Sequence, residues 1–473
     1  MSLSQETRHT SSSANTSCSQ GTSLVLDDRA SVSSVPPESS NRISPFTTAA
    51  TKSPPDLPKN QEKTSTLAVT GEITQNSTVT SFSGKIPIPI LGTIFSHLGT
   101  VLTSGIEWLT EKIIDGGYLP HFLLRKCIQH QFRQRAREIA SPSFAAAFAR
   151  KMAFIEDLRK SDIAIHTDTA NRQHYELPAG LMAAALGPRM KYSCSLFETG
   201  KETLAEAEDA MLASYVDKLG FQDGMSLLDL GCGWGAAVLY FAERFPKSHI
   251  VGFSNSRTQR EHILRLAAAK NLTNVHAVTG DAVTADLGAA LYDRVLSCEM
   301  FEHLKNYDGI MTKTARALRP GGQFLLHVFC HRDTPYHFAG GWMAEHFFSG
   351  GTMPSADLMM YFARADLRVA GHWWLPGRHY HQTIEAWLAN FLRNKEAVWP
   401  SLVAVYGEEM ASVWFNRWQV YYLACAEMFV SGGGDTYGVT HYLFDKAEWG
   451  GRGGARGGAL PGKIPEREGE LSV

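Results

Sequence analysis

Residues 227–235 read LLDLGCGWG, an apolar run that ends in three glycines within five positions. The apolar part is typical of a buried strand, and the residues after the loop have the composition of a helix. Glycines between a strand and a helix allow a sharp turn whose backbone approaches a ligand closely. This stretch therefore predicts a strand–turn–helix unit with a ligand at Gly231, Gly233 and Gly235.

The same alternation continues along the chain after this unit. From about Met225 onward, short apolar runs alternate with helical stretches such as 236–245 and 258–269, which is the pattern of βαβ units on a parallel sheet. The runs that we expect to be strands are 226–230, 249–253, 274–278, 293–298 and 323–329. The predicted fold class is α/β, with a doubly wound, mostly parallel sheet.

The regions on either side of this sheet differ from it in composition. Of the first 83 residues, 32 are Ser or Thr, and such a segment cannot bury enough apolar surface to fold, so 1–83 is predicted to be a disordered tail. Residues 84–190 look helical and predict an N-terminal cap. The Gly-rich residues 447–473 predict a second disordered tail, which leaves 191–446 for the α/β domain.

Charge and cysteine content narrow the class of protein. The formal net charge is -2, whereas a nucleic-acid-binding protein would carry a basic excess, so no nucleic-acid partner is predicted. The seven cysteines are scattered, with no Cys/His cluster of zinc spacing, which indicates reduced thiols in a cytoplasmic protein and no metal site. The apolar segment 86–109 contains two prolines, His97 and Glu107, and predicts a peripheral contact with a membrane rather than a spanning helix. The sequence indicates no oligomeric state.

The glycine loop departs from the common nucleotide-binding patterns. A dinucleotide-binding protein is expected to carry Asp or Glu at the end of the second strand, where it holds the ribose. Here that position reads GFSNSRTQ, residues 252–259, which contains no acid. The spacing GCGWG differs from GxGxxG, and no GxxxxGK[ST] loop is present. Gln259, one turn into the next helix, is therefore the candidate partner of a ribose.

Taken with further blocks, the loop resembles a known family. LDLGCGWG is followed, in order and spacing, by VGFSNSRTQ, GD, FEHLKNY and LRPGGQFLLHVF, as in S-adenosylmethionine-dependent methyltransferases. A second set of blocks is similar to cyclopropane-fatty-acyl-phospholipid synthases, mycolic acid cyclopropane synthases and coclaurine-type plant N-methyltransferases: KYSCSLF (191–197), FFSGGTMPS (347–355), HYHQTIEAW (379–387) and YLACAEMF (422–429). The resemblance covers about residues 118–446. It implies a Rossmann-like class I methyltransferase with a seven-stranded sheet.

The resemblance also implies a cofactor and the residues that contact it. S-adenosylmethionine is the expected methyl donor, consumed in the reaction. Its implied contacts are Tyr192, Ser193, Asp229, Gly231, Gly233, Gly235, Gln259 and Asp281. Asp281 has an alternative interpretation as a helix N-cap, and Ser193 has one as an ordinary turn hydroxyl.

The segment CEMFEH, residues 298–303, places Glu302 beside His303 just after the fourth predicted strand. An amine acceptor must lose a proton to become nucleophilic, and an alkene acceptor must lose one after methylation. Both reactions need a base near the methyl group. We therefore predict that Glu302 and His303 form an acid–base pair, with the alternative that His303 only orients Glu302.

The cyclopropane synthases hold a bicarbonate ion as base through Cys, Glu, His and Tyr side chains. The resemblance assigns these roles to Cys194, Glu302, His327 and Tyr380, so bicarbonate is expected if this chain modifies lipids. The coclaurine-type enzymes keep much of the same set. Phe329 differs from the small aliphatic residue that the synthases have at this position.

Three details favour an amine as the methyl acceptor. EMFEHLKNY and HVFCHRDTPYHF both look like the N-methyltransferase branch. The region after residue 340 is rich in rings that could surround a cation: Trp342, Phe347, Phe348, Trp373, Trp374, Trp387 and Trp418. The alternative for most of these rings is that each simply belongs to the core. The predicted function is N-methylation of a small amine in specialised metabolism. The alternative, favoured by segment 86–109, is methylation or cyclopropanation of unsaturated phospholipid acyl chains.

Overall fold

The computed structural model describes residues 111–164, 177–338, 340–348 and 350–448. The predicted tail 1–83, the segment 86–109 and nearly all of the predicted C-terminal tail lie outside these residues. Within the described part of the chain, no helix is both long enough and apolar enough to cross a membrane.

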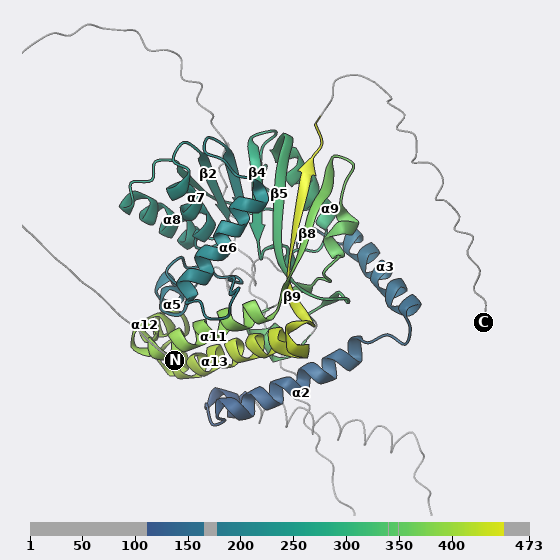
Figure 1. Cartoon of the computed structure of the whole chain (residues 1–473). Coiled ribbons are helices and arrows are strands. Elements are labelled where there is room, and N and C mark those ends of the chain that lie inside the picture. The colour runs from purple at the N-terminus through teal and green to yellow at the C-terminus, as the bar shows by residue number, and fades with distance from the viewer. Residues whose placement is uncertain (1–110, 165–176, 339, 349, 449–473) are drawn as a thin grey trace, which may run out of the picture. The chain divides into compact units, whose positions relative to one another are not determined.

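A seven-stranded sheet forms the centre of the α/β domain, in the order β3-β2-β1-β4-β5-β9-β8 (Figure 1). Neighbouring strands from β3 through β5 pair in parallel, while β9 is antiparallel to both β5 and β8. The strands are β1 (Ser226–Leu230), β2 (His249–Ser254), β3 (Val275–Thr279), β4 (Tyr292–Cys298), β5 (Leu318–His331), β8 (Leu367–Pro376) and β9 (Tyr437–Lys446). The strand pair β6 (Tyr336–His337) and β7 (Thr352–Met353) forms a separate small sheet.

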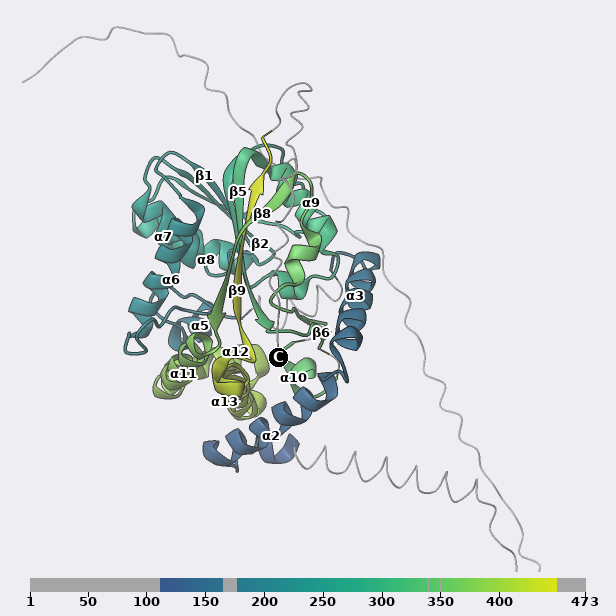
Figure 2. The same ribbon diagram turned by 45° about the vertical axis from the view of Figure 1, so that its right-hand side comes forward.

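Helices cover both faces of the large sheet, as Figure 2 shows. One face carries α6 (Leu204–Leu219), α7 (Ala236–Arg244) and α8 (Arg257–Ala269), and the other carries α9 (Tyr307–Ala317) and α3 (Phe144–Lys160). Side chains alternate between the two faces along each strand, so Leu227 belongs to one hydrophobic core and Leu228 to the other. The predicted doubly wound fold and its five parallel strands are confirmed.

A second group of helices lies below the sheet in Figure 1. Arg125 of α2 donates hydrogen bonds to Glu385 of α11 and Glu427 of α13, both at 2.7 Å. The helices of this group come from before and after the strands β1 to β5: α2 (His121–Ile139), α5 (Ala179–Ala185), α11 (Arg378–Arg393), α12 (Lys395–Tyr406) and α13 (Glu408–Val430). The remaining short helix is α10 (Trp342–His346), and 3₁₀ turns lie at Phe301–His303, Leu358–Phe362 and Ser431–Gly434.

Candidate active site

A cavity lies at the carboxyl ends of β1, β2 and β4, where parallel sheets of this class bind their ligands. The glycine loop, the residues after β2 and Asp281 line one part of it. Another part is lined by Glu299, Glu302, His303 and Phe348, together with Tyr380 of α11 and Tyr421 of α13. The cavity therefore joins the predicted cofactor residues to the predicted catalytic residues.

The glycine loop has a different requirement at each glycine. All three have positive φ, of 84° at Gly231, 51° at Gly233 and 86° at Gly235. A Cβ at Gly231 would lie 2.7 Å from a side-chain carbon of Met300, and one at Gly235 would lie 2.5 Å from Ile263. At Gly233 no described atom lies within 4 Å of the added Cβ. Gly231 and Gly235 are thus needed for packing, whereas Gly233 leaves open space for a ligand.

Buried polar groups beside the loop indicate that it takes a polar ligand. Asp229 is 2% exposed, and its Oδ1 has no hydrogen-bond partner among the described residues. Burial raises the pKa of Asp229 to about 7, against the opposing charge of Lys191. Gln259 is also buried and accepts a hydrogen bond from Ser254 Oγ at 2.6 Å. Because an unpaired buried acceptor is costly, Asp229 fits a ligand that donates hydrogen bonds here.

Tyr192 and Ser193 both line the cavity, as the resemblance implied. The Tyr192 hydroxyl lies 3.1 Å from the hydroxyl of Tyr421. Ser193 Oγ accepts hydrogen bonds from Lys191 Nζ at 2.5 Å and from Cys298 Sγ at 3.2 Å. The serine hydroxyl is therefore part of a buried polar network rather than an ordinary turn.

Asp281 also lines the cavity, and its side chain is exposed. Its Oδ1 accepts a hydrogen bond from the backbone N–H of Val283 at 2.8 Å. This is the geometry of an Asx turn, in which the side chain caps the backbone two residues on. No helix begins at Asp281 in the described chain, so the N-cap interpretation is wrong, but one carboxylate oxygen does serve the turn.

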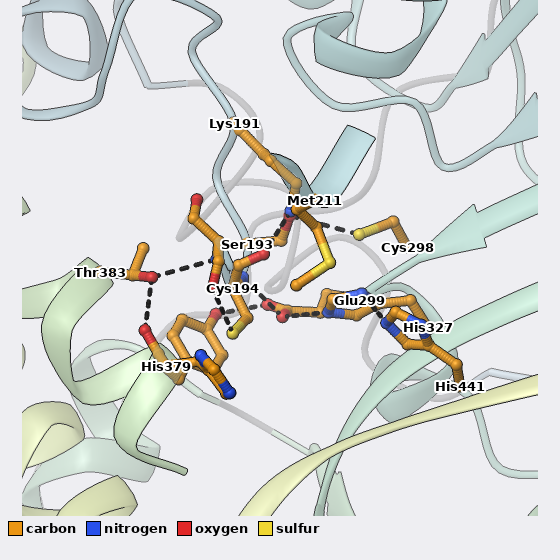
Figure 3. A network of polar contacts seen from close by, with 12 residues as sticks. Lys191, Ser193, Cys194, Met211, Cys298, Glu299, His327, His379, Thr383 and His441 are labelled. Carbon is orange, nitrogen blue, oxygen red and sulfur yellow. Dashed lines mark hydrogen bonds and ion pairs between the residues drawn. The ribbon is translucent and has the colours of Figure 1, made fainter. Parts of the chain in front are cut away.

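Glu299 is the centre of the catalytic part, and the sequence analysis did not single it out. Its Oε1 accepts from the backbone N–H of Cys194 at 3.0 Å and lies 3.0 Å from His327 Nε2, while its Oε2 accepts from the Tyr380 hydroxyl (Figure 3). Cys194 contributes its backbone, because its thiol is directed at the carbonyl of Ser195 instead. Three of the four residues expected around a base thus converge on Glu299 and not on Glu302.

Glu302 lies in the same cavity but in a different environment. It is 1% exposed, and neither carboxylate oxygen has a hydrogen-bond partner among the described residues. Burial raises the pKa of Glu302 well above its usual value, and the nearby charge of Glu299 raises it further. Burial also raises the pKa of Glu299, but the charge of Lys191, the Cys194 N–H and the Tyr380 hydroxyl favour its ionised form. The pair therefore has one carboxylate, Glu299, and one neutral acid, Glu302.

Aromatic rings border this carboxyl pair, though fewer than the sequence suggested. The His303 ring is stacked on Phe348, with 5.8 Å between centroids and 4° between planes. Tyr380, Tyr421 and Phe329 also line the cavity. Of the seven rings expected to surround a cation, only Phe348 lines it; the other six are Trp342, Phe347, Trp373, Trp374, Trp387 and Trp418. These six rings do not line the cavity, and Phe347, Trp387 and Trp418 belong to the hydrophobic core instead.

Comparisons with known proteins identify the family of this chain. The family model for mycolic acid cyclopropane synthetase matches residues 164–438. The chain is 33% identical over 343 residues to the (S)-coclaurine N-methyltransferase of Thalictrum flavum subsp. glaucum, covering 71% of this chain and 94% of that protein. It is 31% identical over 261 residues to the cyclopropane-fatty-acyl-phospholipid synthase of Escherichia coli (strain K12), covering 54% of this chain and 63% of that protein.

A solved structure resembles the fold across the same region. It is a coclaurine N-methyltransferase bound to N-methylheliamine and SAH, with a TM-score of 0.69 and 32% identity. The match covers 71% of this chain and 99% of that one. Fold, glycine loop and family model agree, and the chain belongs to the mycolic acid cyclopropane synthetase family of S-adenosylmethionine-dependent methyltransferases.

Proposed function

We propose that this enzyme methylates the nitrogen of a small amine that carries an apolar, ring-containing skeleton. The observation that carries the proposal is the placement of Glu299, which accepts hydrogen bonds from the Cys194 N–H and the Tyr380 hydroxyl, in a cavity that aromatic side chains also line. Carboxylates and aromatic faces both stabilise positive charge, which an amine carries before and after methylation. The names of relatives that act on coclaurine and pavine support the same class of acceptor.

Some residues of the chain are proposed to bind the cofactor, and others are proposed to remove the proton from the acceptor. S-adenosylmethionine, when bound, supplies a methyl group on a positively charged sulfur. Gly233 leaves room for it, and Asp229 and Gln259 offer polar partners. Glu299 takes a proton from the ammonium form of the acceptor, which leaves a nitrogen lone pair to attack the methyl carbon. Glu302, as a neutral acid whose oxygens have no partner among the described residues, can donate a hydrogen bond to the acceptor without adding a second charge.

His303 has a positioning role in the proposed reaction. It lines the cavity from the 3₁₀ turn after β4, with its ring fixed against Phe348. The turn places Glu302 and His303 next to each other at the cavity wall, and we propose that Glu299, rather than Glu302, is the base of this group. We propose that His303 positions the acceptor nitrogen toward Glu299.

The lipid alternative needs a bicarbonate ion, and the hydrogen bonds around Glu299 argue against one. The Cys194 N–H and the Tyr380 hydroxyl, which could bind an added anion, already donate to Glu299. A second anion beside this carboxylate would be repelled by its charge. An amine needs no such ion, because Glu299 itself is the base.

One experiment tests the proposal against its alternative. The purified full chain is supplied with S-adenosylmethionine labelled in the methyl group and offered either a panel of amines or vesicles of unsaturated phospholipid. We expect label in ring-containing secondary amines, independent of added bicarbonate. Label in the lipid fraction alone, with a requirement for bicarbonate, would reverse the assignment.

A further inference from the structure

A row of hydrogen bonds leads from Glu299 across the sheet toward the protein surface. His327 of β5 contacts Glu299 through Nε2, and its Nδ1 lies 2.8 Å from Nε2 of His441 on β9. The two histidines are register partners on adjacent strands. His441 Nδ1 in turn lies 2.7 Å from Nζ of Lys218, near the end of α6. Figure 3 shows the inner part of this row, with His441 beyond His327.

Burial fixes the charge of the two imidazoles in this row. Both rings are 0% exposed, and burial together with the nearby lysines lowers the pKa of His327 and of His441 well below the usual value. Both are therefore neutral at physiological pH. A neutral imidazole has one N–H donor and one nitrogen acceptor, so the proton on one nitrogen determines the role of the other.

Lys218 then determines which nitrogens carry the protons. An ammonium group only donates hydrogen bonds, so His441 Nδ1 must accept and its Nε2 must carry the proton. That Nε2–H donates to His327 Nδ1, which places the second proton on His327 Nε2. His327 consequently presents an N–H group to the carboxylate of Glu299 at 3.0 Å. In every hydrogen bond of the row, the donor lies on the side of Lys218 and the acceptor on the side of Glu299.

We propose that Lys218 is a positioning residue for methyl transfer, whose ammonium group, acting through His441 and His327, keeps Glu299 in its ionised, basic form. The proposal rests on the role of Glu299 in the proposed function. Lys218 itself lies outside the residues that line the cavity. Its effect is transmitted only through the two imidazoles, because hydrogen bonds in a buried row polarise one another.

Proton transfer along the same row would convert Glu299 from its basic form into a carboxylic acid. Lys218 can pass one proton to His441, His441 one to His327, and His327 one to Glu299. The ammonium and the carboxylate then become an amine and a carboxylic acid, with no change in the number of protons. Burial lowers the pKa of Lys218 to about 8, so loss of its proton to solvent falls within the range of an ordinary assay. Once neutral, Lys218 no longer imposes the tautomers that favour the basic form.

Other titratable groups face the row and must be included in its pH dependence. Asp217 lies beside Lys218 and favours its charged form. The Tyr215 hydroxyl lies 2.8 Å from His327 Nδ1 and 3.4 Å from Cys298 Sγ, and burial keeps the pKa of Tyr215 well above its usual value. Lys191 lines the cavity, and its charge lowers the pKa of Glu299, which burial raises. The raised pKa of Tyr215 keeps this phenol neutral near pH 8, so it does not mimic ionisation of Lys218.

The test compares three lysine variants across pH. Lys218→Met removes the donor, Lys218→Arg retains a permanent cation, and Lys247→Met removes an exposed lysine elsewhere as the matched control. We measure kcat from pH 6 to 10 with saturating cofactor. In Lys218→Met the ascending limb of the kcat profile should move up by about one pH unit, which lowers kcat at pH 7 about fivefold. Lys218→Arg should keep the ascending limb at or slightly below the wild-type position, because the cation persists as pH rises, and Lys247→Met should match the wild type.

A second measurement does not depend on the acceptor. Imidazole ¹⁵N spectra of the free full-length enzyme, assigned with His327→Gln and His441→Gln, report which ring nitrogen carries the proton. We expect the Nε2–H form of both rings in the wild type at pH 7 and loss of that single form in Lys218→Met. Unchanged tautomers and an unchanged pH profile in Lys218→Met would overturn the role of Lys218. Altered tautomers without turnover of any amine would instead contradict the proposed function.

Discussion

Glu299 accepts hydrogen bonds from the Cys194 N–H and the Tyr380 hydroxyl, whereas Glu302, three residues later in the chain, accepts none from the described residues. Two buried carboxyl groups in one cavity cannot both be ionised at low cost. The hydrogen bonds therefore decide which of the two is the base. Glu299 is assigned as the basic carboxylate, and Glu302 is assigned as the neutral carboxylic acid.

The first prediction compares glutamine substitutions at these two positions. Glu299→Gln removes the base and should lower kcat by about 100- to 10,000-fold at pH 7. Glu302→Gln replaces a neutral acid by a neutral amide, so its loss should stay below about tenfold. Rates with an amine acceptor and calorimetric binding of the cofactor, measured for both variants, check this. A greater loss in Glu302→Gln than in Glu299→Gln would show that the charge assignment is reversed.

The second prediction concerns stability and pH. Because the pKa of Glu302 is raised in the folded protein, its contribution to stability is fully present below the pKa of the unfolded chain and is lost as pH rises through the folded value. The amide of Glu302→Gln does not ionise, so the variant does not lose stability at this position as the pH rises. The variant should therefore gain stability over the wild type between pH 5 and pH 8, by about 1–3 kcal/mol at the upper end. Denaturant unfolding at several pH values measures the difference, and a constant difference across this range would contradict it.

Much of the sheet could be predicted because its parallel strands are buried on both faces. Such strands appear as short apolar runs, and the five predicted runs coincide with β1 to β5 within a few residues. The strands β8 and β9 were not among these runs. β9 carries buried Thr440 and His441, and most of β8 is partly or fully exposed, so neither has the apolar pattern of the others. Only the resemblance to the methyltransferase family implied that the sheet has seven strands.

The catalytic carboxylate could not be assigned from sequence because CEMFEH contains two glutamates. Glu299 has a φ of 48°, a left-handed conformation that is uncommon for a residue other than glycine. This conformation follows the last residue of β4 and is not encoded in any local pattern. One signal was present: Glu299 is the first residue after a predicted strand at the carboxyl edge. His441 and Lys218 are far from the motif in sequence; the pairing of β5 with β9 brings His441 near, and the packing of α6 against β5 brings Lys218 near.

The third prediction tests the open space at Gly233. Gly233→Val should weaken binding of S-adenosylmethionine at least 100-fold, because the side chain enters the space left for the ligand. Gly220→Val is the matched control, since Gly220 also has a φ of 51° and no described atom within 4 Å of its added Cβ. Both variants should lose about 1–2 kcal/mol of stability from the left-handed backbone. Calorimetric titration should show the binding loss only at Gly233, and equal affinity in the two variants would sink the assignment.

The last prediction separates two roles for Phe348. If its ring holds a cationic acceptor, Phe348→Leu should raise KM for the amine although it keeps much of the apolar surface, whereas Phe348→Tyr should leave KM nearly unchanged. A cation–π contact of about 0.5–2 kcal/mol corresponds to roughly a 2- to 30-fold rise in KM. The kcat should change little, because the contact is the same in substrate and transition state. Phe148→Leu, at an exposed ring of α3, is the control. Equal KM values in Phe348→Leu and the wild type, with an altered KM only in Phe348→Ala, would show that the ring acts through its apolar surface and not through its attraction for a cation.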